Sequence, residues 1–468
     1  MTTRIKGGYL PLLATIVSLA WPTMLEQLMQ TAVQYIDTAM VGSLGTAATA
    51  AVGATGTVNW LIGSTISALS IGFLAFIAKS LGAGEKERAK RASGQAVMAV
   101  LIAGSFFTVL TLSLSRMVPV WRQVVPAIQA LAADYFFILY LPMLPRAATT
   151  IFGTVLRAAG DTKTPMKIGI FVNLLNVILN FFLIYETRTI AIFSLALTIP
   201  GAGLDVIGAA VASAISFTAG GIAITLVLWQ HPRISPRGQS ILPDGSILRP
   251  CLRVSLPNML QRFGTSLGYV AFASMINSLG EIATAAHTIA NTVESAFYIP
   301  GYGMQTAAAT LSGNAYGAKD ADRMKKIAQL LIPLEIGLMI LSGGLLFWLA
   351  PPLVALFTES AAVITLGCTV LRMVALSEPI FGFSIVVEGM MQGVGQTKAP
   401  FLYNIVGMWA IRILGTALCT QPWGGGLIAA WACMILHNLF LFFMYLICFL
   451  RGSWNPLKKD LPKINGGI

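Results

Sequence analysis

Residues 21–29 read WPTMLEQLM and residues 256–264 read LPNMLQRFG, two related segments 235 positions apart. The same offset aligns SLG at 43–45 with SLG at 278–280, and GDTKTP at 160–165 with GQTKAP at 395–400. The alignment needs no gap from the first of these segments to the last. Because chance matches do not keep one offset across several loops, the sequence predicts two homologous halves.

Composition places both halves in a membrane. The chain has 468 residues, 56% of them hydrophobic and 10% charged, and its mean hydropathy is +0.78, which is typical of an integral membrane protein. Apolar stretches of the roughly 20 residues that cross a hydrocarbon core recur along it. They are too long and uniform for barrel strands. We therefore expect an all-α fold with twelve transmembrane helices, near 10–42, 48–79, 93–117, 129–157, 166–186, 203–229, 248–278, 283–315, 327–350, 362–392, 400–420 and 426–450.

Six helices in each half return the chain to the side on which it entered. The halves then form a parallel repeat, related by a pseudo-two-fold axis along the membrane normal. We expect an N-terminal six-helix lobe at 1–230, a polar, proline-rich cytoplasmic linker at 231–247 and a C-terminal six-helix lobe at 248–468 that ends in a short cytoplasmic tail. Alternating access uses this architecture, with substrate bound between two rocking lobes, whereas a pore or scaffold does not require it.

The formal net charge of +12 follows membrane topology. Most basic residues fall in the loops of one side, and Arg116, Arg122 and Arg188 fall on the other. The positive-inside rule then predicts that both termini are cytoplasmic. We expect a multi-pass protein of the plasma (inner) membrane. No basic patch requires a nucleic acid, and nothing at the N-terminus resembles a cleavable signal. The five cysteines lack metal-ligand spacing, so we expect neither a metal site nor a disulfide.

Polar stripes run along several predicted spans. At 100° per residue, six polar residues of the first span fall within about 100° of arc. A charge at the bilayer centre costs at least roughly 2.5–3.5 kcal/mol, so this stripe should face the bundle, a water-filled cavity or another helix, and not lipid. Four polar residues of the seventh span occupy equivalent positions, but Asp37 aligns with Phe272. The stripes comprise Thr23, Glu26, Gln27, Gln30, Gln34 and Asp37 in the first span, and Asn258, Gln261, Arg262 and Thr265 in the seventh.

Further polar faces occupy the eighth and fifth spans, each within about 60° of arc. His287 and Glu294 either line a cavity or form satisfied buried pairs, and the asparagines are interpreted as helix-packing residues. Asp37 lies five residues before Gly42, about 8 Å inside the end of the helix. The alternative to a functional role for Asp37 is therefore that of a carboxylate at the membrane interface. Glu26 either has a structural partner such as Arg262 or a transport role. The face of the eighth span comprises His287, Asn291, Glu294, Tyr298 and Gln305, and that of the fifth span comprises Asn173, Asn176 and Asn180. Five further ionisable residues within spans are interpreted as structural or interfacial: Glu335, Arg372, Glu378, Glu388 and Arg412.

Several motifs together resemble the multidrug and toxic compound extrusion family, known as MATE. They are WPTMLEQLMQTAVQYIDTAMVGSLG, SLGAGEKERAKR, RAAGDTKTP and their C-terminal echoes. The resemblance implies an antiporter that expels amphipathic, often cationic, compounds in exchange for protons or sodium ions. In prokaryotic members a first-helix aspartate is a coupling-ion residue, which Asp37 matches. A fifth-helix Asn and Asp one turn apart often accompany it; here that pair reads Asn176 and Asn180, without the second carboxylate.

Other family members use a seventh-helix glutamate, near where Gln261 stands, and an acidic tenth-helix residue, near Glu378. We therefore expect a coupling site for H⁺ or Na⁺ at Asp37, Asn176 and Asn180, with Asp37 as the candidate Na⁺ ligand and no other metal. Substrates are expected to be small amphipathic or cationic molecules, and the protein a monomer without a cofactor. The expected cavity residues are Glu26, Gln30, Gln34, Gln261, Arg262, His287, Asn291, Glu294, Tyr298 and Glu378.

Three other functions compete with antiport. A lipid-linked precursor flippase of the same superfamily is the main alternative, but such proteins often carry extra helices and a strongly cationic cavity. An enzyme is not expected, because the three histidines are scattered and form no catalytic cluster. A channel is likewise not expected. No GxxxxGK[ST] loop is present, so exchange would proceed without ATP.

Overall fold

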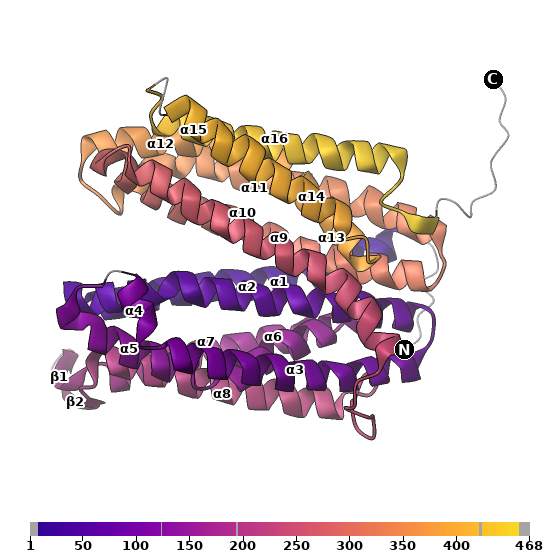
Figure 1. The fold of residues 1–468 in the computed structure, drawn as a ribbon, viewed down its shortest axis with the longest axis horizontal. Helices are drawn as coiled ribbons and strands as arrows, with labels where there is room; N and C mark the ends of the chain where they lie inside the picture. The colour runs from indigo at the N-terminus through magenta and orange to yellow at the C-terminus, as the bar shows by residue number, and fades with distance from the viewer. Residues whose placement is uncertain (1–7, 123, 193–194, 421–423, 458–468) are drawn as a thin grey trace.

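The computed structural model describes residues 8–122, 124–192, 195–420 and 424–457, and shows two helical lobes lying side by side (Figure 1). This confirms the all-α fold of two repeated bundles. Arg4, Lys6, Lys458, Lys459 and Lys463, which contributed to the predicted topology, lie outside the described residues. The first lobe contains α1 (Tyr9–Gly42), α2 (Thr46–Gly82), α3 (Lys86–Leu114), α4 (Met117–Trp121), α5 (Pro126–Tyr140), α6 (Met143–Ala158), α7 (Lys163–Leu183), β1 (Glu186–Ile192), β2 (Leu195–Ala202) and α8 (Asp205–Gln230).

The second lobe repeats the order of the first. Its elements are α9 (Gly245–Asn277), α10 (Glu281–Gly317), α11 (Ala321–Ala355), α12 (Ala361–Ala375), α13 (Glu378–Gly393), α14 (Lys398–Val406), the π-helix η1 (Gly407–Ile413), α15 (Leu414–Thr420) and α16 (Leu427–Arg451). The bounds of α10, α12 and α13 are those of α2, α5 and α6 shifted by the repeat offset. Gly45 and Gly280 precede the second helix of each lobe with φ of 108° and 103°, a conformation that glycine adopts without steric cost.

One element was not expected. An antiparallel hairpin of β1 and β2 separates α7 from α8, and no hairpin stands between the corresponding helices of the described second lobe. The insertion ends the common offset, because α16 begins well before the position that the offset from α8 would give it. The repeat therefore holds from α1 to α7 and is lost at the last helix.

Eight helices of the described chain are long and apolar enough to cross a membrane. Two bent pairs raise this number to ten: α5 with α6, at 48°, and α12 with α13, at 51°. The spans expected at 129–157 and 362–392 are therefore broken helices. Pro142 lies in the first break and Pro379 follows the second, and proline removes a backbone donor from a helix. The long polar helices α9 and α10 are not among the ten, so a total of twelve crossings stays a prediction.

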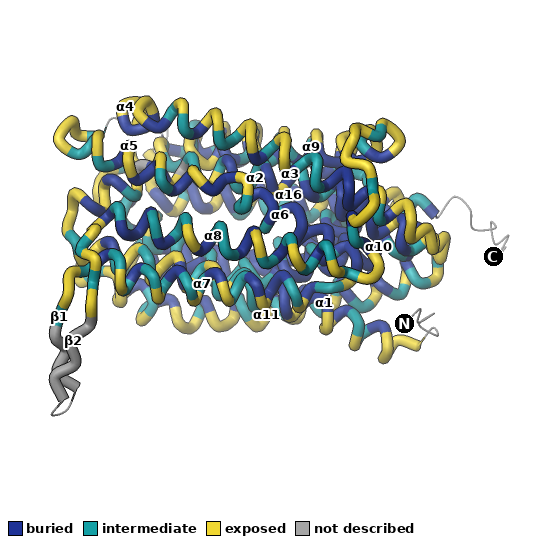
Figure 2. The backbone as a smooth tube through the Cα atoms, turned by 90° about the horizontal axis from the view of Figure 1, so that it is seen from below, coloured by how far each residue is buried: buried dark blue, intermediate teal, exposed yellow. Residues whose placement is uncertain are grey.

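The outer faces of the lobes are apolar. Ile102 and Phe106 on α3, Leu174 on α7, and Ile222 and Leu226 on α8 are all more than half exposed. Figure 2 shows such exposed positions alternating with buried ones along α7 and α8. Since lipid is the only solvent in which so much exposed apolar surface is stable, these faces belong to the hydrocarbon region.

The lobes pack most tightly at the end that bears the basic loops 83–91 and 318–326, here called the basic end. A Cβ atom added to Gly82 would overlap the carbonyl oxygen of Asn314, and one added to Gly317 would overlap that of Lys79. Ser255 Oγ also donates to Leu69 O at 2.7 Å. Figure 1 shows the lobes diverging from the basic end, where the N-terminus lies, toward the end that carries the hairpin.

The predicted linker is short and attached to the first lobe. It spans 231–244, because α9 begins at Gly245 rather than 248. Gln95 of α3 donates to Leu242 O at 2.7 Å and accepts from Asp244 N at 3.0 Å. Asp244 also caps α9 by accepting from Ser246 N, and the two hydrogen bonds from Ser246 lower the pKa of the Asp244 carboxyl. The start of the second lobe is thus anchored on α3.

Candidate functional site

The structure brings the predicted coupling residues together in the first lobe. Asn180 Nδ2 donates to Asp37 Oδ1 at 2.6 Å and lies 3.3 Å from Asn176 Oδ1. Asn176 contacts Ser213 Oγ of α8 at 3.1 Å, a residue that the sequence did not single out. If the oxygen and nitrogen of the Asn176 amide exchange places, its nitrogen donates to Asp37 Oδ2 at 3.0 Å while its oxygen accepts from Ser213. Helices α1, α7 and α8 therefore each contribute to one polar cluster.

This cluster offers oxygen atoms to a small cation. Asn176 and Asn180 are buried, and Asn180 Oδ1 lacks a hydrogen-bond partner within the described chain. A buried acceptor is costly when left unsatisfied, and hard cations prefer carboxylate and amide oxygens. Asp37 is half-buried and lies five residues before the end of α1. The arrangement can hold a proton on Asp37 or a cation among these oxygens.

Glu26 has a partner within its own lobe. Both of its carboxylate oxygens lie 2.7 Å from Arg157 Nη2 of α6, so Arg157, and not Arg262, neutralises it. A Cβ atom at Gly169 would lie 3.3 Å from Glu26 Cγ, which shows that α7 packs directly over this carboxylate. Glu26 is therefore enclosed between α1, α6 and α7.

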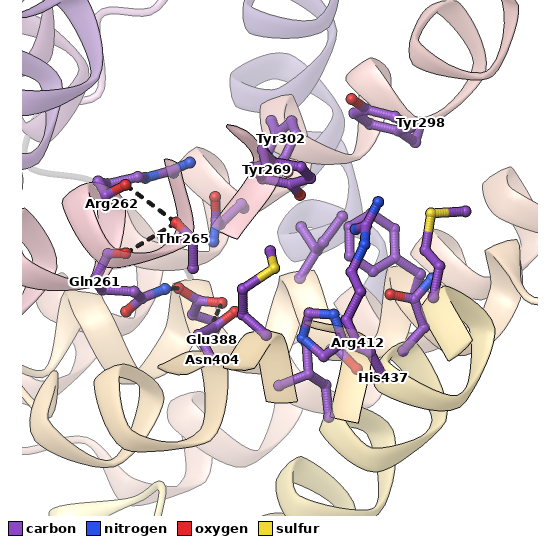
Figure 3. Close-up of a pocket in the computed structure, with 18 of the residues that line it drawn as sticks. Gln261, Arg262, Thr265, Tyr269, Tyr298, Tyr302, Glu388, Asn404, Arg412 and His437 are labelled. Carbon is purple, nitrogen blue, oxygen red and sulfur yellow. Dashed lines mark hydrogen bonds between the residues drawn. The ribbon is translucent and has the colours of Figure 1, made fainter. Parts of the chain in front are cut away.

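The second lobe contains a carboxylate network that the sequence did not predict. Gln261 and Gln392 donate to Glu388 Oε1 at 2.9 and 3.0 Å. Tyr445 donates to Oε2 at 3.1 Å, and Asn404 Nδ2 lies 3.4 Å from the same oxygen. Figure 3 shows Gln261 directed toward Glu388, beside Asn404. A usable signal was the spacing of Glu388 and Gln392, which puts both on one face of a helix.

Two polar cavities lie at the centre of the molecule. Cavity A, about 130 Å³, is lined mainly by the second lobe, and cavity B, about 270 Å³, by both lobes. Arg262, Tyr302 and Gln305 line both cavities. Cavity A also includes the predicted residues Gln261, Asn291, Glu294 and Tyr298, together with Glu388 and Arg412. Cavity B includes Thr23, Gln27, Ser67, Thr154, Arg157 and Gln392.

The remaining predicted cavity residues line neither of these cavities. His287 is partly buried and accepts from Trp431 Nε1 at 3.2 Å. Glu378 is 2% exposed and lies in the interior of the second lobe. Gln30 and Gln34 are exposed on α1, and Glu26 faces Arg157.

Arg412, on η1, is a buried cation held by aromatic rings. Its guanidinium lies 4.2 Å from the ring centre of Phe272 and 5.0 Å from that of Tyr269, distances typical of cation–π attraction. Glu294 lies close enough to interact with it electrostatically. Phe272 is the repeat counterpart of Asp37. The second lobe thus has a ring and an arginine where the first lobe has a carboxylate cluster.

Repeated helical lobes with apolar exteriors and polar cavities between them define a multi-pass membrane protein of the transporter class. The MatE family model matches residues 22–182 in the first lobe and 257–418 in the second. The chain belongs to this family of multidrug efflux transporters.

Relatives and solved structures agree with this membership. The chain is 26% identical to the probable multidrug resistance protein NorM of Thermotoga maritima, over 94% of this chain and 92% of that protein. It is 24% identical to the probable multidrug resistance protein YpnP of Bacillus subtilis, over 96% of this chain and 98% of that protein. An outward-facing multidrug resistance MATE transporter of the MOP superfamily shares the fold, with a TM-score of 0.84 at 22% identity over 97% and 98% of the chains. A MOP superfamily transporter from Pyrococcus furiosus also shares the fold, with a TM-score of 0.84 and 23% sequence identity, over 95% of this chain and 96% of that chain.

Proposed function

We propose that this protein is a secondary antiporter of the plasma (inner) membrane. It exports amphipathic, often cationic, compounds in exchange for H⁺ or Na⁺, and it needs neither ATP nor a cofactor. The observation that carries the proposal is the cluster of Asp37, Asn176, Asn180 and Ser213, with its hydrogen-bonded carboxylate and its unsatisfied buried amide oxygen. Relatives described as probable multidrug resistance proteins support the substrate class.

The cluster has a physical route to the lobe interface. The ionised Asp37 carboxylate accepts from Asn180 on α7. Protonation or cation binding removes or redirects that acceptor, and thereby changes how α1 packs against α7. The same α1 touches the other lobe: a Cβ atom at Gly303 of α10 would lie 2.8 Å from Met24 N. Movement of α1 therefore shifts the packing of α1 on α10.

Topology follows from the charges. The basic end faces the cytoplasm under the positive-inside rule, which makes both termini cytoplasmic. In this proposal, tight packing at Gly82 and Gly317 closes the cytoplasmic side. The proposed transport unit is a monomer, a proposal supported by the fact that one chain supplies both lobes and the lining of cavity B.

The flippase alternative fits less well. A strongly cationic cavity would suit a phosphorylated head group, but cavity A balances Arg262 and Arg412 with Glu294 and Glu388. This mixed lining favours small amphipathic molecules.

Transport assays in proteoliposomes test the proposal. Purified wild type should drive efflux of a cationic dye under an imposed proton or sodium gradient, and the effective gradient names the coupling ion. Asp37→Asn should abolish gradient-driven efflux, because an asparagine amide neither ionises nor takes up a proton near neutral pH. Asp134→Asn is the matched control, since Asp134 is an exposed carboxylate of α5 in the same lobe. Intact coupled efflux by Asp37→Asn for several substrates would remove Asp37 from the coupling site.

A further inference from the structure

Two cysteines meet where α15 packs against α16 in the second lobe. Cys419 lies one residue before the end of α15, and Cys433 is a buried residue of α16. Their sulfur atoms are 4.0 Å apart, which is contact distance for two thiols. The sequence gave no sign of this pair, because 14 residues separate the two cysteines and only the packing of the two helices brings them together.

The contact depends on the absence of a side chain at Gly415. Gly415 and Cys419 are four residues apart, so they lie on one face of α15. A Cβ atom at Gly415 would lie 3.2 Å from Cys433 Sγ. The face of α15 that carries Cys419 is therefore the face that meets α16, and the Cys433 sulfur lies over the glycine beside the Cys419 thiol.

The geometry is close to that of a disulfide. Bond formation requires the two sulfur atoms to approach from 4.0 Å to about 2 Å. A change between staggered rotamers at one cysteine moves its sulfur by a comparable distance. Cys419 is half-exposed, whereas Cys433 is 7% exposed. The main chain at Cys419 is held in place, since its carbonyl oxygen accepts from Gly425 N at 2.9 Å. The approach therefore needs rotation of side chains and no movement of either helix.

The position of the pair decides its redox environment. Figure 1 shows α15 at the end of the molecule that carries the hairpin, opposite the basic end. The topology proposed above places this end outside the cytoplasm. Disulfides form and persist in extracytoplasmic compartments, whereas cytosolic thiols are kept reduced. The two thiols thus meet on the side of the membrane where a bond between them is stable.

We propose that Cys419 and Cys433 form a disulfide that fastens the outer end of α15 to α16. The oxidant is a disulfide-bearing molecule of the outer compartment. The thiolate of Cys419, the more exposed cysteine, attacks one sulfur of that disulfide, forms a mixed disulfide and releases one thiolate. The Cys433 thiolate then attacks Cys419 Sγ, which forms the internal bond and releases the second thiolate. Two electrons pass from the cysteine sulfurs to the oxidant, and its two released thiolates take up the two protons.

The bond would join two helices of one lobe and would not bridge the lobes. The inference rests on the proposed topology and does not depend on which compounds are transported or which ion is coupled. It concerns the stability of the second lobe, since a cross-link restricts the unfolded chain more than the folded one.

Peptide mapping of the purified full-length protein tests the proposal. One sample is incubated with hydroxyethyl disulfide, a small neutral oxidant, and another with dithiothreitol; free thiols are then alkylated and the protein is digested with chymotrypsin. Chymotrypsin cleaves after Trp423, between the two cysteines, so their disulfide appears in mass spectrometry as two peptides joined until reduction. The joined peptides should appear in the oxidised sample alone. The oxidised protein should also unfold several degrees higher than the reduced protein.

Serine variants assign both results to this pair. Cys419→Ser and Cys433→Ser should each abolish the joined peptides and the difference in unfolding temperature between oxidised and reduced protein. Cys368→Ser replaces a buried cysteine of α12 and is the matched control, which should keep both. Because each variant is compared with itself in two redox states, a general loss of stability does not obscure the result.

Two outcomes would overturn the proposal in the purified protein: oxidised wild type without the joined peptides, or Cys419→Ser that keeps the oxidation-dependent shift. Alkylation of intact cells before lysis examines the protein as it is made. The bond should already be present there, and a pair trapped as free thiols would overturn its formation outside the cytoplasm. The peptide assay involves no transport, so a failure of gradient-driven efflux would count against the antiporter and not against the disulfide.

Discussion

The two lobes place a carboxylate in the same part of the repeat but build it differently. In the first lobe Glu26 of α1 is neutralised by Arg157 of α6. The positions equivalent to these two are Gln261 and Gln392, which are neutral, and the carboxylate comes instead from Glu388, whose counterpart is Gly153. The first lobe thus has a closed ion pair, and the second has a carboxylate held by neutral donors. The same backbone arrangement can therefore hold a buried carboxylate in two ways, because the charged residues stand on different helices in the two lobes.

Among substitutions that test how the two lobes differ, we expect the largest effect on stability at Phe272, the repeat counterpart of Asp37. Phe272→Ala should destabilise the protein by about 4 kcal/mol, because the ring is 1% exposed and its loss leaves both a cavity and an uncovered Arg412. Thermal unfolding in detergent measures the change. Phe263→Ala, at an exposed ring on the same helix, should cost far less. Equal effects at the two positions would contradict this account of Phe272.

The ion pair of the first lobe gives the next largest effect. Arg157→Gln leaves Glu26 without its cation and should cost about 3 kcal/mol, toward the lower end for a broken buried pair because both side chains are partly exposed. The double variant Glu26→Gln with Arg157→Gln imitates the neutral pair of the second lobe. It should regain most of the lost stability in the same unfolding assay. A double variant no more stable than Arg157→Gln would show that charge imbalance is not the cause.

The network of the second lobe should yield the smallest effect. Tyr445→Phe removes the donor at 3.1 Å from Glu388 Oε2 and the acceptor at 3.2 Å from Asn404 Nδ2. The contacts of Gln261, Gln392 and Asn404 with Glu388 stay in place. We expect a loss of about 2 kcal/mol in unfolding free energy, within the range of a hydrogen bond to a charged group. Tyr403→Phe, whose ring lies beside Tyr445, is the control. A loss of stability as large as that of Arg157→Gln would show that the other donors do not hold the Glu388 carboxylate in place without Tyr445.

Some patterns along single helices could be predicted from the sequence, whereas contacts between distant helices could not. The constant offset between the halves predicted the repeated helix bounds, and the i, i+4 spacing of Asn176 and Asn180 predicted two amides on one face of α7. The Glu388 network joins α9, α13, α14 and α16, and only tertiary packing brings these helices together. The same holds for the pairing of Glu26 with Arg157. The hairpin of β1 and β2 breaks the repeat, and so the repeat could not predict it.

The glycine contacts at the basic end are themselves related by the repeat. Gly82 meets Asn314 O and Gly317 meets Lys79 O, and each member of one contact is the counterpart of a member of the other. The contact between the lobes at this end is consequently built by main chain lying on main chain. Backbone amides do not titrate in the physiological range, so the contact does not depend on the protonation state of any side chain. If this end closes the transport path, as proposed above, its closure rests on backbone geometry and is independent of pH.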